Sequence, residues 1–128
     1  MLQIGYYKNF KGDQPTLLFA GSASDVLKLM VFFRDWDGEK TDLLKYFENG
    51  SIIEVNKIQN IIIERGVHGR TNVTSDDFSL TWSITKKDQD RIMGLLEGLV
   101  ESNKPSHQYL NDGLSNIQII CSKDEYPN

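Results

Sequence analysis

Two stretches of the chain place a short apolar run directly before a capped amphipathic helix, and this pattern constrains the fold most. In the first, "TLLFA" leads into "GSASDVLKLMVFF", and in the second "LTWSI" leads into "TKKDQDRIMGLLEGLV". Each helix begins with a hydroxyl residue and an aspartate three positions later, which is the spacing of a capping box. The alignment leaves open whether the chain contains a duplication. It pairs Ser22 with Thr85, Asp25 with Asp88, Leu29 with Ile92, Met30 with Met93 and Phe19 with Trp82.

The remaining apolar segments read as strands. "LQIGYYK", "SIIEV", "NIIIERG", "DFSLTWSIT" and "NIQIICS" are rich in β-branched and aromatic residues and are separated by turn-forming residues. "TDLLKYFENG" suits either a short helix or a strand. The simplest arrangement is an antiparallel meander. We therefore predict a single α+β domain over residues 1–128, in which two amphipathic helices pack on one face of a mainly antiparallel sheet as a two-layer sandwich.

Composition narrows the functional classes. The 128 residues carry 18 acidic and 14 basic side chains, and the net charge of −4 opposes nonspecific binding to nucleic acid. No apolar run is long enough to span a bilayer, and the N-terminal residues lack the pattern of a secretion signal. The single cysteine and the two histidines show no metal-binding spacing, so we expect no metal or other cofactor. These features predict a cytoplasmic protein without a nucleic-acid or membrane partner.

Cys121 and His107 are the sharpest enzymatic candidates, because a cysteine nucleophile needs a nearby base. However, strand alternation places Cys121 on the same face as Ile117 and Ile119, and a buried lone cysteine usually packs as a small hydrophobe. We therefore expect no catalytic residues. His68 lies between glycines in a turn-like segment and is expected to be a solvated loop residue.

The stretch "RDWDGEKTDLLKYFENG" interleaves carboxylates with aromatic residues, which is typical of a protein-binding surface. Trp36 fits a core position and an interface position equally well. The acidic chain terminus adds a second group of available side chains. The predicted binding residues are Asp35, Trp36, Asp37, Glu39, Asp42, Tyr46, Glu48, Asp124, Glu125 and Tyr126.

The chain resembles the small α+β immunity proteins of bacterial polymorphic and contact-dependent inhibition toxin systems. The resemblance rests on "HQYLNDG…IQIICSKDEYP", on "LLFAGSASDVLKL", and on the size and acidic charge of the chain. It implies a cytoplasmic inhibitor that binds a cognate toxin C-terminal domain, often a nuclease, as a 1:1 complex and blocks its active site or substrate surface. Two alternatives remain: a small ligand-binding or metabolic enzyme domain with a site near His107 and Arg70, and a structural or assembly subunit, such as a homodimer through an exposed strand edge.

Overall fold

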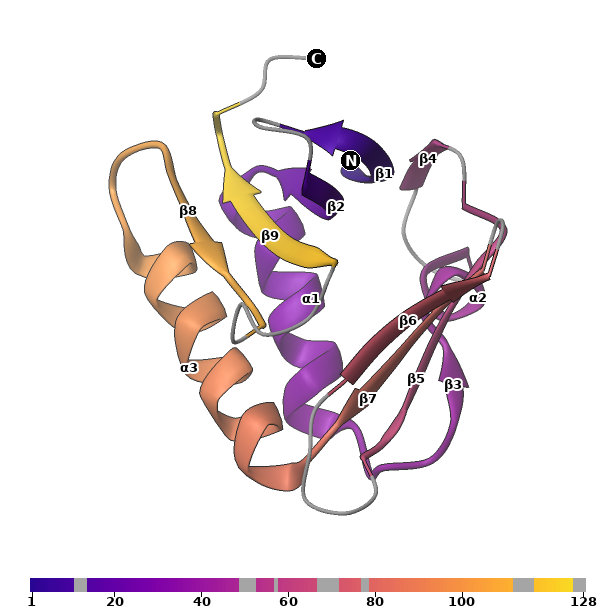
Figure 1. Cartoon of the computed structure of the whole chain (residues 1–128). Helices are drawn as coiled ribbons and strands as arrows, with labels where there is room; N and C mark the ends of the chain where they lie inside the picture. Colours follow the sequence, from indigo (N-terminus) through magenta and orange to yellow (C-terminus); the bar gives the residue numbers. More distant parts are fainter. Residues whose placement is uncertain are drawn as a thin grey trace.

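The computed structural model describes residues 1–10, 14–48, 53–56, 58–66, 72–76, 79–111 and 117–125; among these, the side chains of residues 9–10, 48, 53–56 and 72–76 are not described. Within these ranges the chain forms nine strands and three helices, which confirms the α+β class (Figure 1). None of the described helices is long and apolar enough to cross a membrane.

The strands form two sheets. The first sheet has the order β4 (Ile53–Asn56), β1 (Leu2–Phe10), β2 (Gln14–Gly21), β9 (Gln118–Lys123) and β8 (Ser106–Tyr109). The second sheet has the order β3 (Thr41–Asp42), β5 (Asn60–Arg65), β7 (Ser79–Ile84) and β6 (Asn72–Asp76). The helices are α1 (Ala23–Asp35), α2 (Leu43–Glu48) and α3 (Lys86–Glu101).

The strand pairing differs from the predicted meander. β4 joins the first sheet beside β1, and β5 pairs with β7 in parallel, so the segments "SIIEV", "NIIIERG" and "DFSLTWSIT" do not follow one another in space. β2 and β9 are also parallel. The prediction of a single sheet built as a meander was therefore wrong, although four of the seven strand pairings among the described residues are antiparallel. Alternation shows which face of a strand is apolar but not which strand lies beside it. The ambiguous segment "TDLLKYFENG" contains both the short strand β3 and the short helix α2.

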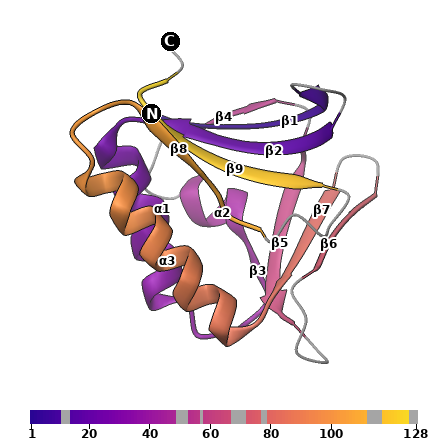
Figure 2. The same cartoon turned by 60° about the vertical axis from the view of Figure 1, so that its left-hand side comes forward.

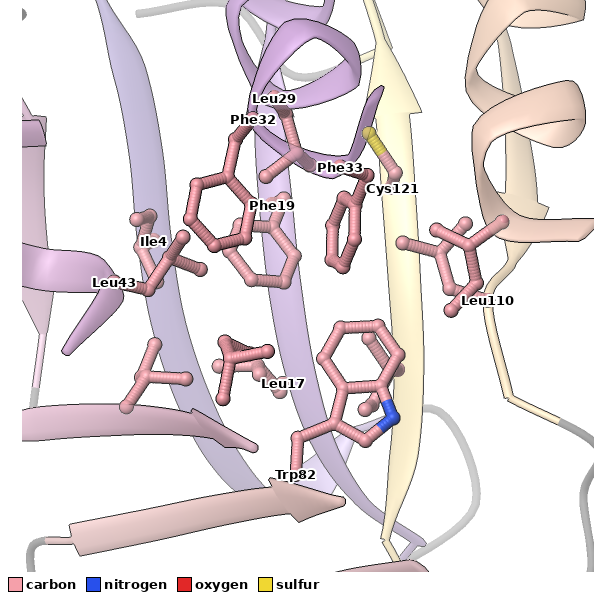
Figure 3. Close-up of a cluster of buried hydrophobic side chains, with 14 of the residues drawn as sticks. Ile4, Leu17, Phe19, Leu29, Phe32, Phe33, Leu43, Trp82, Leu110 and Cys121 are labelled. Atoms are coloured by element: carbon pink, nitrogen blue, oxygen red, sulfur yellow. The ribbon is translucent and has the colours of Figure 1, made fainter. Parts of the chain in front are cut away.

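The two sheets and the helices enclose one main core. In Figure 2 the sheets meet at a steep angle, and α1 and α3 lie side by side across the open side between them. Side chains from both sheets and all three helices meet in this core; Figure 3 shows part of the cluster. At its centre the rings of Phe33 and Trp82 make an edge-to-face contact at 5.6 Å, and both side chains are fully buried.

Both predicted helix starts are present. The Ser22 side chain accepts a hydrogen bond from the Asp25 amide, and the Asp25 carboxylate accepts from the Ser22 amide at 2.9 Å, which completes a capping box. The Thr85 side chain accepts from the Asp88 amide at 3.2 Å. Hydroxyl caps therefore fix where α1 and α3 begin, because each satisfies a backbone donor that has no partner within the helix.

The repeated pattern extends beyond the strand and the helix. The order β1–β2–α1–β3–β5 in the first half, with α2 and β4 inserted before β5, matches β6–β7–α3–β8–β9 in the second half. In each half a strand hairpin precedes the helix, and the last two strands pair with each other in antiparallel fashion. Those last two strands join the sheet of the opposite half, since β9 pairs with β2 and β5 pairs with β7. We call these segments the first and second halves.

The registers of the two halves agree. Phe19 lies beside Cys121, which lies beside Gln108; at the matching positions, Trp82 lies beside Ile63, which lies beside Thr41. Two backbone hydrogen bonds that close the strand ends match as well: Asp124 N–H donates to the Gly21 carbonyl, and Gly66 N–H donates to the Ile84 carbonyl, both at 2.9 Å. The halves therefore share one architecture.

Candidate protein-binding surface

The acidic loop, residues 35–39, follows α1 and is fixed from beneath by a buried tryptophan. Trp36 is the C-cap residue of α1 and is only 8% exposed. Its indole Nε1–H donates to the Glu39 carbonyl at 2.7 Å, and its ring stacks on Phe32 with centroids 6.4 Å apart. Of the two readings that the sequence left open, the core reading of Trp36 is therefore correct. The residue orders the loop from below and is not itself available to a partner.

Two polar residues order the loop further. The Asp37 carboxylate accepts from the Glu39 amide at 3.0 Å, and the Thr41 hydroxyl donates to the Glu39 carbonyl at 2.8 Å. Gly38 has a φ of +94°, a conformation that side chains with a Cβ disfavour. The two hydrogen bonds therefore hold the backbone of Glu39 on both its amide and its carbonyl side, directly after Gly38.

Arg65, at the end of β5, supports the same loop from the second sheet. Its guanidinium carbon lies 4.5 Å from the centroid of the Trp36 ring, which is cation–π geometry. The guanidinium also lies under Gly38, where a Cβ would approach its Nε and Nη2 to 2.9 Å. The Arg65 Nη1 atom is buried and has no hydrogen-bond partner among the described residues. Arg65 therefore acts on the loop through stacking rather than through an ion pair with its carboxylates.

The loop presents three exposed acidic residues, Asp35, Asp37 and Glu39. Asp35 is bound by Arg34 through two hydrogen bonds of 2.8 and 3.1 Å. The hydrogen bonds from Arg34 lower the pKa of the Asp35 carboxyl, aided by the charge of the guanidinium. Both side chains are more than half exposed, so this ion pair contributes little to stability. Asp35 therefore lies at the surface with its charge paired to that of Arg34.

Tyr46 adds an aromatic group next to the loop. The residue projects from α2 and is 46% exposed. Its ring makes edge-to-face contacts with Phe32 at 4.9 Å and with Phe47 at 5.2 Å. Phe32 thus contacts both Tyr46 and Trp36, which places Tyr46 and the acidic loop on the same aromatic support. We call the acidic loop together with Tyr46 the acidic–aromatic surface.

Two further predicted binding residues in this stretch, Asp42 and Glu48, do not belong to the acidic loop. The Asp42 carboxylate accepts hydrogen bonds from the amides of Leu44, at 3.2 Å, and Ile61, at 3.4 Å. Asp42 therefore opens α2 and ties it to β5. The residue is partly exposed, and its assignment as a binding residue stays a prediction. The side chain of Glu48 lies outside the described residues, as does Tyr126.

The acidic residues near the chain terminus form a separate group. The Glu125 carboxylate lies 3.0 Å from His107 Nδ1 and accepts from the Ser122 hydroxyl at 2.6 Å. Asp124 is exposed and has a φ of 60°. Because the Asp124 amide bonds to Gly21, just before α1, this group lies at the opposite end of α1 from the acidic loop. A 13-residue helix is about 20 Å long, so the structure does not bring the two groups together.

Cys121 and His107 also stay apart. Cys121 is fully buried in the same core cluster as Phe33 and Trp82 (Figure 3), and burial raises the pKa of its thiol to about 12. His107 is exposed and lies beside Ser122 in the sheet, so it faces the opposite side of the first sheet from Cys121. The two residues therefore do not form a nucleophile–base pair.

Arg70 and His68 lie outside the described residues, and the described residues contain no group of three or more possible metal ligands.

Several supporting residues were missed by the sequence reasoning. Arg65 and Phe32 hold the acidic loop from different elements, and Gln89 of α3 donates from its Nε2 to the carbonyls of Phe33, at 2.6 Å, and Trp36, at 2.9 Å. A cation that ends the apolar run "NIIIER" and a glutamine at a core-facing position of α3 were the only available signals.

Comparisons with family models, with curated proteins and with solved structures find no match to this chain.

Proposed function

We propose that this protein is an immunity protein that binds a cognate bacterial toxin domain, in particular a nuclease, and blocks its active site or substrate surface. The observation that carries this proposal is the acidic–aromatic surface, in which exposed carboxylates and Tyr46 rest on a buried support of Phe32, Trp36 and Arg65. The net charge of −4 points in the same direction. A nuclease must present a basic groove to its phosphate substrate, and this surface has the opposite charge.

The order within the loop favours tight binding. A loop that is already held in one conformation loses little conformational freedom when a partner binds, so less of the interaction energy is spent on ordering. Carboxylates steer a basic partner during encounter, while a tyrosine in contact with a buried ring supplies an anchor. A stoichiometric inhibitor needs nanomolar affinity, which corresponds to about −12 kcal/mol.

The first experiment uses the gene neighbourhood. A reading frame for a large secreted protein, encoded beside this gene, would supply a candidate toxin C-terminal domain. We expect co-expression of that domain with this protein to rescue bacterial growth and to give a 1:1 complex by size-exclusion chromatography with light scattering. Growth arrest that persists in spite of co-expression, together with no complex, would refute the proposal.

A pair of charge-reversed variants then locates the surface. Asp35→Lys with Glu39→Lys changes an ion-paired acid and a second exposed acid at the loop; Asp90→Lys with Glu97→Lys does the same on α3. Each acid-to-lysine change adds two positive charges, so both double variants bring the net charge from −4 to 0. We expect the loop variant to weaken toxin binding at least tenfold, about 1.4 kcal/mol, and the α3 variant to bind as the wild type does. Equal effects would show that only the total charge matters.

A further inference from the structure

The two sheets have four edge strands, and one of them differs from the rest. β3, β4 and β6 contain the acidic residues Asp42, Glu54 and Asp76, respectively. β8, with the sequence "SHQY", contains no acidic residue, no lysine or arginine, and no proline. Charged residues and prolines are the usual means by which proteins prevent an edge strand from pairing with another chain. Among the described strands, β8 is therefore the edge that is least protected against pairing.

The backbone of β8 offers hydrogen-bonding groups on its outer side. β8 is antiparallel to β9, and just beyond it the Leu110 amide donates to the Ile119 carbonyl at 2.8 Å. In an antiparallel pair only alternate residues bond to the neighbouring strand. Since Leu110 bonds toward β9, the N–H and C=O groups of His107 and Tyr109 point away from it, toward the free edge.

The side chains of these same two residues are arranged as a pair. Tyr109 is 50% exposed, and its ring meets the His107 imidazole edge to face at 5.6 Å. His107 is in turn held by the Glu125 carboxylate, at 3.0 Å from Nδ1. The exposed side chains beside the free edge thus include two rings in contact with each other.

The matching edge strand of the first half, β3, is protected against pairing with another chain. Tyr109 lies beside Ile120 in the first sheet, and the matching residue in the second sheet is Asp42, which lies beside Ile62. Asp42 directs its carboxylate back to the amides of Leu44 and Ile61, and β3 is only two residues long. The first half therefore closes its edge with a charged residue, whereas the second half presents an exposed tyrosine.

We propose that β8 pairs in antiparallel fashion with β8 of a second copy of this chain. A two-fold axis at Gln108 places Tyr109 opposite His107 of the second copy, so that two ring pairs form across the interface. The occupant is a second copy because this pairing brings no acidic strand residue of one copy against another. In a chain of net charge −4, self-pairing of β3, β4 or β6 would bring such residues together. The dimer joins two five-stranded sheets into one, and it does not depend on the proposed toxin binding.

The test measures the mass of the protein in solution. A four-residue strand buries little area, so we expect a dimer with a dissociation constant in the micromolar range. Sedimentation velocity over a wide concentration range should therefore show a species of twice the 14.6 kDa chain mass. Tyr109→Lys should raise the dissociation constant at least tenfold, because it places a like charge on each side of the two-fold axis. Tyr46→Lys is the matched control, as Tyr46 is 46% exposed and lies on α2; it should leave the dimer intact.

Hydrogen exchange on the wild-type protein provides a measurement that needs no variant. The amides of His107 and Tyr109 should become protected as the concentration rises, whereas protection of the β9 amides stays constant. A wild-type protein that remains monomeric at all concentrations would overturn the proposal. A dimer whose β8 amides still exchange freely, or one that Tyr46→Lys breaks and Tyr109→Lys does not, would place the interface elsewhere and overturn it as well. Pairing of β8 with a strand of the toxin alone would also exclude the homodimer.

Discussion

The two halves carry a cation at the same position and use it differently. Arg65 ends β5 and Lys123 ends β9, and their registers against β7 and β2 correspond. Each cation meets the C-cap residue of the helix in its own half: Arg65 stacks on Trp36, and Lys123 Nζ donates to the Ser102 carbonyl. Lys123 is only 2% exposed. Positive charge at a helix C-terminus is favourable, so both cations complement the end of a helix.

The two cations differ in what they contact besides the helix end. Lys123 donates to the carbonyl of Ser102, the C-cap residue of α3, and is enclosed by the protein, so its interaction serves that helix end. The Arg65 guanidinium instead lies next to Gly38 of the acidic loop, and its Nη1 atom has no hydrogen-bond partner within the described part of the chain. The same architecture thus forms a closed helix end in the second half and a supported surface loop in the first half. Equivalent positions in the two halves are therefore the most informative places to introduce substitutions.

The largest effect is expected where the halves are most alike. Phe19 and Trp82 occupy matching positions and are both fully buried. Phe19→Ala and Trp82→Ala should each lower the free energy of unfolding by about 3–5 kcal/mol, because each leaves a cavity in the shared core. Urea unfolding followed by circular dichroism measures both. Leu27→Ala, at a position that is 41% exposed, is the control and should cost less than about 1 kcal/mol. If only one of the two core variants lost several kcal/mol of unfolding free energy, the two positions would not be energetically equivalent.

A smaller loss is expected at Gln89, whose position in the first half is held by the fully buried Val26. Gln89→Leu removes two hydrogen bonds and leaves the carbonyls of Phe33 and Trp36 unpaired in the interior. The expected cost is about 1–3 kcal/mol, reduced by the removal of the Gln89 Oε1 atom, which is itself buried without a partner. Hydrogen exchange should show faster opening of the last turn of α1. An increase in stability would mean that the unpaired oxygen outweighs the two bonds.

Substitution of the two cations should affect different properties: Lys123 the free energy of unfolding, and Arg65 the order of the acidic loop. Lys123→Met removes a buried charged donor from the end of α3 and should cost about 1–2 kcal/mol in unfolding free energy. Arg65→Met should cost less than about 1 kcal/mol, because it loses only a cation–π contact and an unpaired donor. Arg65→Met should nevertheless shift the fluorescence of Trp36, whereas Lys123→Met should not. The opposite ranking of unfolding free energies would show that Arg65 contributes to stability as Lys123 does.

The smallest effect is expected at the first helix cap, where it is present near neutral pH and lost at acid pH. Burial acts to raise the pKa of the Asp25 carboxyl, but hydrogen bonds from the Ser22 amide and hydroxyl and from the Met1 amino group, with its charge, outweigh burial and lower that pKa. A lowered pKa means that the ionised carboxylate stabilises the fold above the unfolded-state pKa. This stability is lost as pH falls through the lower, folded-state pKa.

Asp25→Asn tests this assignment. The variant should be less stable than the wild type near neutral pH, and the difference should shrink as pH falls below about 4, where the wild-type carboxylate also becomes protonated. Urea unfolding at a series of pH values measures the difference, and Asp88→Asn at the α3 cap provides a comparison in the second half. A difference that stays constant across the acid range would show that ionisation of Asp25 makes no contribution.

Much of the local structure could be predicted from the sequence. Ser22 and Thr85 begin the helices where their spacing to Asp25 and Asp88 indicated, and Cys121 shares the core face with Ile119 as strand alternation requires. Asp35, Asp37 and Glu39 were expected at the surface and lie there. The sequence did not indicate the contacts that depend on a distant segment: Asp42 bonds to the Ile61 amide, and Trp36 is stacked by Arg65.

The sequence by itself determined the helix starts, the apolar faces and the surface charge, because capping, periodicity and charge are properties of residues close together in the chain. Only the tertiary structure decided the exchange of strands between the two sheets, the support of the acidic loop by Arg65, and the exposure of Tyr109 at an open edge. These features join residues that are far apart in the chain. Alternating apolar residues are compatible with many strand pairings, and packing of the complete core selects one of them.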